Sequence, residues 1–212
     1  YPHEFLKGWT GTLVVDAYAG YDATMSLERR KTANCLAHAR RKFDELFKAN
    51  ASPVAAQAIG RIAWLYRVEA DARGLSCEQR LQMRQERSKP LREELHAWLR
   101  LERTRVPDGS AIAKAIDYSL NHWQALSEFL KDGAVPVDNN WIENQIRPIA
   151  IGRNNWLFAG SLRAGQRAAA VMSLIQSAKL NGHDPYAYLK DVLARLPTQK
   201  QSQIEELLPH RW

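Results

Sequence analysis

The feature that most constrains this fold is a helical pattern that runs from residue 53 to about residue 133, with no strand-like segment inside it. Residues 53–73 place apolar side chains at helical spacing. Residues 110–133 do so more clearly, with Ser110 as the expected cap and Gly133 as the expected stop. So long a helical block in a chain of 212 residues predicts a mainly helical protein with little room for a sheet.

Between those two segments lies a charged stretch with two local signals. Ser76 to Gln79 has the spacing of a capping box and should begin a helix. Pro90 should break or kink that helix, because proline offers no backbone N–H and its ring clashes with the preceding turn. The mixed charges of residues 80–105 are most simply explained as a solvated helix face.

Strand-like segments precede residue 40. Residues 13–15 are a short apolar run between glycines, typical of a strand buried on both faces in a parallel or mixed sheet. Residues 32–39 indicate a weaker second strand, followed by an amphipathic helix. Asp16 ends the first strand, where open α/β sheets present residues to ligands. The plainer interpretation is that Asp16 caps the turn that follows.

The order of these segments predicts an α/β fold class that is mainly helical by content. Two further helices are expected at residues 164–182 and 184–197, and Asp184 should cap the second. The expected organisation has four parts: residues 1–50 with the strands, a helical insertion at 51–135, a second core segment at 136–197, and a polar, loosely held tail at 198–212.

The charge balance favours a polyanionic partner. The chain has 30 Lys and Arg against 23 Asp and Glu, a net charge of +7 and a pI near 9.5, which is typical of nucleic-acid binding. Cys35 and Cys77 make no disulfide framework, so a reducing, cytoplasmic location is expected. No apolar run has the length of a membrane span, and the N-terminal residues lack a signal-peptide pattern.

Residues 137–161, VDNNWIENQIRPIAIGRNNWLFAGS, place a single carboxylate, Glu143, among amides, aromatic rings and arginines. Asn140 and Glu143 have capping-box spacing, so Glu143 could simply begin a helix. That helix should be short, because Pro148 disfavours a helical conformation at Arg147. Alternatively, Glu143 works on a negatively charged ligand.

The polar residues that follow Glu143 indicate a phosphate-binding surface. The expected DNA-binding residues in this part of the chain are Arg147, Arg153, Asn154, Asn155, Arg163 and Arg167. Trp141 and Trp156 are either core residues or platforms for base stacking. On the residues alone nucleic-acid binding is favoured, and catalysis stays open.

Three blocks, VDAYAGYDA, CLAHARRKFDEL and residues 137–197, resemble in that order the C-terminal catalytic region of bacterial insertion-sequence transposases of the IS66 family. The last block spans 61 residues. The resemblance implies a DDE-type transposase with a partial RNase H-like fold, in which an all-helical insertion separates the second and third catalytic acids. Asp16 matches the second acid and Glu143 the third.

The resemblance also implies cofactors and partners. Three carboxylates would hold two Mg²⁺ or Mn²⁺ ions that act on a DNA phosphodiester. The family's first Asp lies on an earlier strand, and since the chain starts without Met we expect an N-terminally truncated copy. A two-metal site is expected only with that Asp present, and Asp138 is the fallback ligand. The parent should be a homo-oligomer acting on transposon ends and target DNA; the alternative is a non-catalytic DNA-binding or assembly module.

Residues 35–41, CLAHARR, carry weaker signals. Cys35 and His38 form half of a zinc-like spacing, and Cys77 is a candidate third ligand, but no second pair follows. A buried Cys and a His near the sheet, close to Asp16 if the strands are neighbours, are the simpler interpretation. Arg40 and Arg41 should face DNA.

Overall fold

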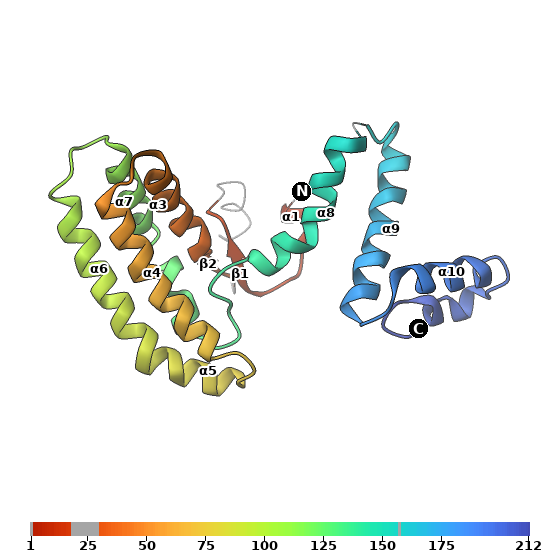
Figure 1. Ribbon diagram of the computed structural model, residues 1–212. Coiled ribbons are helices and arrows are strands. Elements are labelled where there is room, and N and C mark those ends of the chain that lie inside the picture. The colour runs from red at the N-terminus through yellow and green to blue at the C-terminus, as the bar shows by residue number, and fades with distance from the viewer. Residues whose placement is uncertain (1, 18–29, 157) are drawn as a thin grey trace. The chain divides into compact units, whose positions relative to one another are not determined.

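The computed structural model describes residues 2–17, 30–156 and 158–212 (Figure 1). They divide into two compact units, Tyr1–Asn140 and Trp141–Trp212. The division falls at the start of the helix that carries Glu143. The four segments expected from the sequence stay a prediction.

The first unit is built on four helices that form a closed arrangement: α3 (Leu36–Asn50), α4 (Pro53–Asp71), α6 (Lys89–Arg103) and α7 (Ala111–Asn121) (Figure 1). Helix α4 packs against α3 and α6, and α7 packs against the same two helices. Their apolar faces meet in one core that includes Phe43, Leu65, Leu99 and Ile116. The prediction of a mainly helical protein is confirmed.

Pro90 does not break its helix, contrary to expectation. Helix α5 (Cys77–Met83) runs through a π-helical turn, η2 (Arg84–Ser88), directly into α6, whose first turn holds Pro90. The π turn changes the backbone hydrogen-bond pattern just before Pro90. The N–H that the proline lacks therefore falls at a position where the regular α-helical pattern is already interrupted. The predicted capping box is confirmed, since Ser76 and Gln79 exchange both hydrogen bonds.

The single helix expected over residues 110–133 is wrong in its second half. Ser110 caps α7 as predicted, but α7 ends at Asn121 and a 3₁₀ helix, η3 (Ala125–Leu130), follows a turn. That turn brings Trp123 onto the side chains of α6. Gly133 is required for packing and not as a helix stop, because a Cβ there would lie 1.9 Å from the Cys77 carbonyl oxygen.

Two parallel strands, β1 (Gly11–Val15) and β2 (Arg30–Asn34), form the sheet of the described residues, after a short helix α1 (Pro2–Phe5). Val15 lies opposite Asn34. The expected strand over residues 32–39 ends early, since Leu36 already begins α3, whose sequence is rich in good helix formers. Of β1, only Val15 is fully buried, so burial on both faces is not observed.

The second unit contains α8 (Asn140–Trp156), α9 (Leu162–Leu180), α10 (Pro185–Arg195) and a 3₁₀ helix η4 (Gln201–Leu207). The short helix expected before Pro148 is wrong, because α8 continues through the proline. Proline costs about 3 kcal/mol inside a helix. Here the Asn144 carbonyl that loses its donor belongs to an exposed residue, where water can replace the bond.

The end of the chain packs on α10. Asp184 caps α10 as predicted. The Tyr188 hydroxyl donates to the Leu207 carbonyl (2.7 Å), and both residues are buried in a small core with Ala178 and Val192. Residues 201–207 are therefore held, contrary to the loosely held tail expected there. Within the described ranges, no helix has both the length and the apolar character needed to cross a membrane.

Candidate functional site

Asp16 directly follows β1 and its side chain is exposed. The next residue, Ala17, has a left-handed φ of 64°, so the backbone turns sharply after the aspartate. The Tyr118 hydroxyl of α7 donates to the Asp16 carbonyl (3.3 Å). Burial first, and next the charge of Asp16, raises the pKa of Tyr118, so its hydroxyl stays protonated and can donate. The helices thus hold the strand end while its carboxylate faces solvent.

The stretch that leads into α8 is tied to the same end of the sheet. The Cys35 amide donates to the Val15 carbonyl (2.8 Å), and the Leu36 amide donates to the Val137 carbonyl (3.0 Å). The Asn139 amide lies 3.5 Å from the Cys35 sulfur. Burial raises the pKa of the Cys35 thiol, so this cysteine is an uncharged core residue and not a nucleophile.

Asp138 has a structural role at the start of α8. Its Oδ1 accepts from the Asn140 amide (3.1 Å), and its Oδ2 accepts from the Asn140 side chain and from the Tyr66 hydroxyl (both 2.9 Å). Burial, and next the Asp138 charge, raise the pKa of Tyr66. No local pattern in the sequence indicates a role for Tyr66, because its partner lies 72 positions away. Asp138 already accepts three hydrogen bonds just before α8, which weakens its case as a metal ligand.

The other candidate ligands are spread over several elements. Glu143 lies half-exposed in the first turn of α8 in the second unit, whereas Asp16 belongs to the first unit. His38 is half-buried on α3, Cys35 is buried and Cys77 is exposed. Among residues 2–17, 30–156 and 158–212, no three His, Cys, Asp or Glu side chains are grouped so that they could hold a metal ion.

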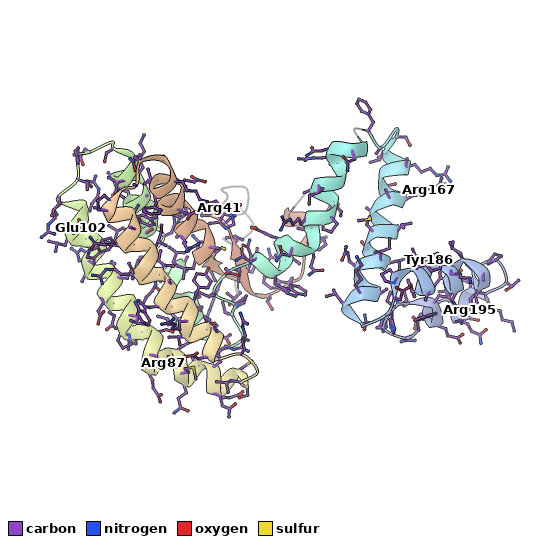
Figure 2. All side chains as sticks on the ribbon, in the orientation of Figure 1. Arg41, Arg87, Glu102, Arg167, Tyr186 and Arg195 are labelled. Atoms are coloured by element: carbon purple, nitrogen blue, oxygen red, sulfur yellow. The ribbon has the colours of Figure 1, made fainter. Side chains whose placement is uncertain are left out.

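The arginines expected to bind phosphate in the second unit lie on helices α8 and α9. Helices α8 and α9 carry five Lys and Arg against one carboxylate, Glu143. Arg147, Arg153, Arg163 and Arg167 are all exposed, and in the described part of the chain none of them forms an ion pair. Figure 2 shows Arg167 extending from α9. Asn154 and Asn155 are exposed near the end of α8.

Surface arginines of the first unit behave differently. Arg87 pairs with Asp71 (2.7 Å), and Arg105 pairs with Glu102 (2.9 Å). Because ion pairs neutralise these cations, an incoming phosphate gains less from them than from the arginines of α8 and α9. The two remaining predicted DNA contacts, Arg40 (half-buried) and Arg41 (exposed), lie on α3 in the first unit.

Aromatic and aliphatic side chains are exposed beside these arginines. Trp141 is 63% exposed and Phe158 is 86% exposed. Residues of α8, of α9 and of the connection between them, including Arg153, Phe158 and Met172, line an open apolar pocket of about 420 Å³. Exposed rings beside cations suit base stacking. The side chain of Trp156 lies outside the described residues.

Comparison with known families gives two matches. A family model described as "Transposase IS66 family" matches residues 1–167. A second, described as "IS66 C-terminal element", matches residues 173–210, which include the small core around Tyr188. No solved structure matches.

Two uncharacterized proteins of Sinorhizobium fredii (strain NBRC 101917 / NGR234) are similar over nearly the whole chain. The protein y4hP is 40% identical over 228 residues, covering 100% of this chain and 41% of the relative. The protein y4jD is 41% identical over 216 residues, covering 98% of this chain and 42% of the relative. The chain thus spans about two fifths of the length of these relatives.

Proposed function

The chain belongs to the IS66 family of transposases, and from that premise we propose that it is the catalytic region of an enzyme that cuts and joins DNA at insertion-sequence ends. The observation that carries the proposal is the set of exposed arginines without ion pairs on α8 and α9. Arg147 follows Glu143 by one helical turn, so a phosphate bound by the arginine would lie close to the carboxylate.

The proposed chemistry rests on Asp16 and Glu143. An exposed carboxylate at a strand end and another in the first turn of a helix offer the oxygen donors that Mg²⁺ and Mn²⁺ prefer. We propose that both hold metal, together with an Asp that the family resemblance places on an earlier strand of an RNase H-like sheet. Two such ions would stabilise the attacking and leaving oxygens of the phosphodiester. The arginines would hold and orient the backbone phosphates.

A second candidate function is a DNA-binding or assembly module without catalysis. It is favoured by one observation: the basic surface lies within one unit and does not depend on Asp16. Both functions predict DNA binding, so only cleavage separates them. In either case the parent transposase is proposed to act as a homo-oligomer, which light scattering of the protein on DNA would measure.

Nicking of a plasmid that carries the insertion-sequence ends, in Mg²⁺ or Mn²⁺, tests the proposal. The 212-residue chain should bind this DNA without nicking it, since each missing carboxylate weakens the hold on two mutually repelling cations. The chain extended upstream to include the earlier Asp should nick. In that extended protein Glu143→Gln should abolish nicking and leave DNA binding nearly intact.

Asp138→Asn is the matched control, because an asparagine removes the charge and can keep the acceptor for the Asn140 amide, although its NH2 group replaces the oxygen that accepts from Tyr66 and from the Asn140 side chain. It should retain nicking if Asp138 only positions the chain before α8 and lose it if Asp138 is the metal ligand. If the 212-residue chain nicks DNA and Glu143→Gln nicks equally well, the assignment of these residues is wrong. If the extended protein binds DNA but never nicks, the binding module is the better description.

A further inference from the structure

Arg92 is a buried cation, and two of its donor atoms have no hydrogen-bond partner among the described residues. It is 3% exposed, and neither its Nε nor its Nη2 has a partner among the described residues. Burial lowers the pKa of its guanidinium to about 9, so the group still carries its charge at neutral pH. A buried charge without a partner is strongly unfavourable. Its presence points to a partner that the described residues do not supply.

Arg84, two turns earlier along the same continuous helix, shows what a satisfied buried arginine looks like here. It is 1% exposed, and Glu69 accepts two hydrogen bonds from it (2.8 and 2.6 Å). Its Nη1 also donates to three carbonyl oxygens, those of Phe129, Asp132 and Val135, each at 2.9 Å. The fold can therefore satisfy a buried guanidinium fully, and at Arg92 it does not.

Arg92 is held in place by an aromatic ring. Its guanidinium carbon lies 3.3 Å from the centroid of the Trp123 ring, and the His96 ring stacks on the same indole at 4.4 Å. Stacking is favourable for a guanidinium, but it engages the planar face. The N–H groups point outward in the plane, so stacking orients them without satisfying them.

Both Arg92 and Trp123 line an open pocket of about 560 Å³ with a basic rim. The rim residues are Lys89, Arg100 and Lys131, and His96 and Glu93 also line the pocket. Glu128 pairs with Lys131 (2.7 Å), whereas Lys89 and Arg100 form no ion pair among the described residues. Cations thus outnumber carboxylates around the pocket that Arg92 lines.

We propose that this pocket binds a phosphate group, with the Arg92 guanidinium donating hydrogen bonds and with Lys89 and Arg100 adding charge. Two neighbouring N–H groups in the plane of a guanidinium can donate hydrogen bonds to two oxygens of the same phosphate. The phosphate is either a phosphodiester of a nucleic-acid backbone or a free phosphate group. The site lies between α6 and η3 and includes neither Asp16 nor Glu143, so a test of it does not depend on the proposed DNA cleavage.

Titration of the 212-residue chain with inorganic phosphate, against chloride at constant ionic strength, tests the site. Phosphate should shift the Arg92 Nε–H resonance in NMR spectra and saturate. Arg92→Gln should weaken phosphate binding at least about tenfold. It should still fold, because it removes a charge without a partner. Exposed Lys89→Gln should weaken binding less and leaves the core untouched.

Arg61→Gln is the matched control, since Arg61 lies over Trp98 (5.0 Å) in the same bundle but lines a different pocket. It should bind phosphate like the wild type. An Arg92 resonance that phosphate leaves unmoved, or equal binding by Arg92→Gln and the wild type, would overturn the proposal.

A 20-base-pair DNA duplex distinguishes the two sources. If the duplex shifts the same Arg92 resonance and inorganic phosphate competes with it, the ligand is a backbone phosphodiester. If inorganic phosphate shifts the resonance and the duplex does not, the ligand is a free phosphate group. Both results support a phosphate site, and a response to neither probe contradicts it.

Discussion

The Tyr66 hydroxyl donates a hydrogen bond to the Asp138 carboxylate at 2.9 Å, across 72 positions of the sequence. It joins α4 of the helical bundle to a residue two positions before α8 begins. Asp138 also accepts two hydrogen bonds from Asn140, so the contact fixes the chain just before the helix that carries Glu143. The helical bundle and the residues just before α8 are therefore coupled through one side chain.

Tyr66→Phe should lower the free energy of unfolding by about 1.5–3 kcal/mol, the usual worth of a hydrogen bond to a charged group. Urea unfolding would measure the change. Tyr186→Phe is the control, since Tyr186 is 76% exposed and should change stability very little. Equal stabilities for Tyr66→Phe and the wild type would show that the bond to Asp138 contributes nothing.

Arg84 and Arg87 offer a second matched pair, since each joins η2 to an acid of α4. The Arg84–Glu69 pair is nearly buried, with side chains 1% and 16% exposed, whereas both partners of Arg87–Asp71 are 47% exposed (Figure 2 labels Arg87). Arg84→Met should lower stability by about 3–5 kcal/mol, because it leaves Glu69 and buried carbonyls unpaired. Arg87→Met should cost less than about 1 kcal/mol. Similar losses in urea unfolding would refute this ranking.

Local signals in the sequence predicted much of the secondary structure. The caps at Ser76, Ser110 and Asp184 were correct, because a cap depends on residues three positions apart. Neither Pro90 nor Pro148 ends its helix: of the break or kink expected at Pro90 the break is not observed, and the short helix expected before Pro148 is wrong. In both cases the loss of the hydrogen bond is compensated locally. At Pro90 a π turn precedes the proline, and at Pro148 the carbonyl that loses its donor belongs to an exposed residue.

The contacts that organise the candidate sites could not be predicted. Tyr66 meets Asp138, and Arg92 meets Trp123, through tertiary packing that no spacing in the sequence encodes. The turn that interrupts residues 110–133 has the same origin, because it places Trp123 on α6. The exposed arginines of α8 and α9 were predictable from composition alone, since a segment with one carboxylate has little to pair them with.

Protonation of His96 should reduce stability. Burial first, and then the positive charges of Arg100 and Arg92, lower the pKa of His96 below its ordinary value of about 6.5. The unfolded chain thus binds a proton at higher pH than the folded one. The contribution is fully present above pH 6.5 and is lost as pH falls through the folded pKa.

NMR titration of the His96 ring would measure this pKa directly. Arg92→Gln should raise it toward 6.5, while Arg61→Gln should leave it unchanged. His96→Gln should also flatten the decline in unfolding free energy below pH 6.5. A His96 pKa at or above 6.5 in the wild type would contradict the electrostatic description of this pocket.

DNA affinity should depend steeply on salt, and the slope should report the arginines of the second unit. Each phosphate neutralised on duplex DNA contributes about −0.9 to the slope of log K against log salt, because a bound cation releases condensed counterions. Arg163 and Arg167, on the first turns of α9, are exposed and form no ion pair among the described residues. Arg163→Gln and Arg167→Gln should each make the slope less steep by about 0.9.

Arg105→Gln is the control, since Arg105 is paired with Glu102 and its loss should leave the slope unchanged. Fluorescence anisotropy with a labelled duplex between about 50 and 200 mM salt covers the informative range. Binding that ignores salt, or identical slopes for all three variants, would show that these helices do not contact the phosphate backbone.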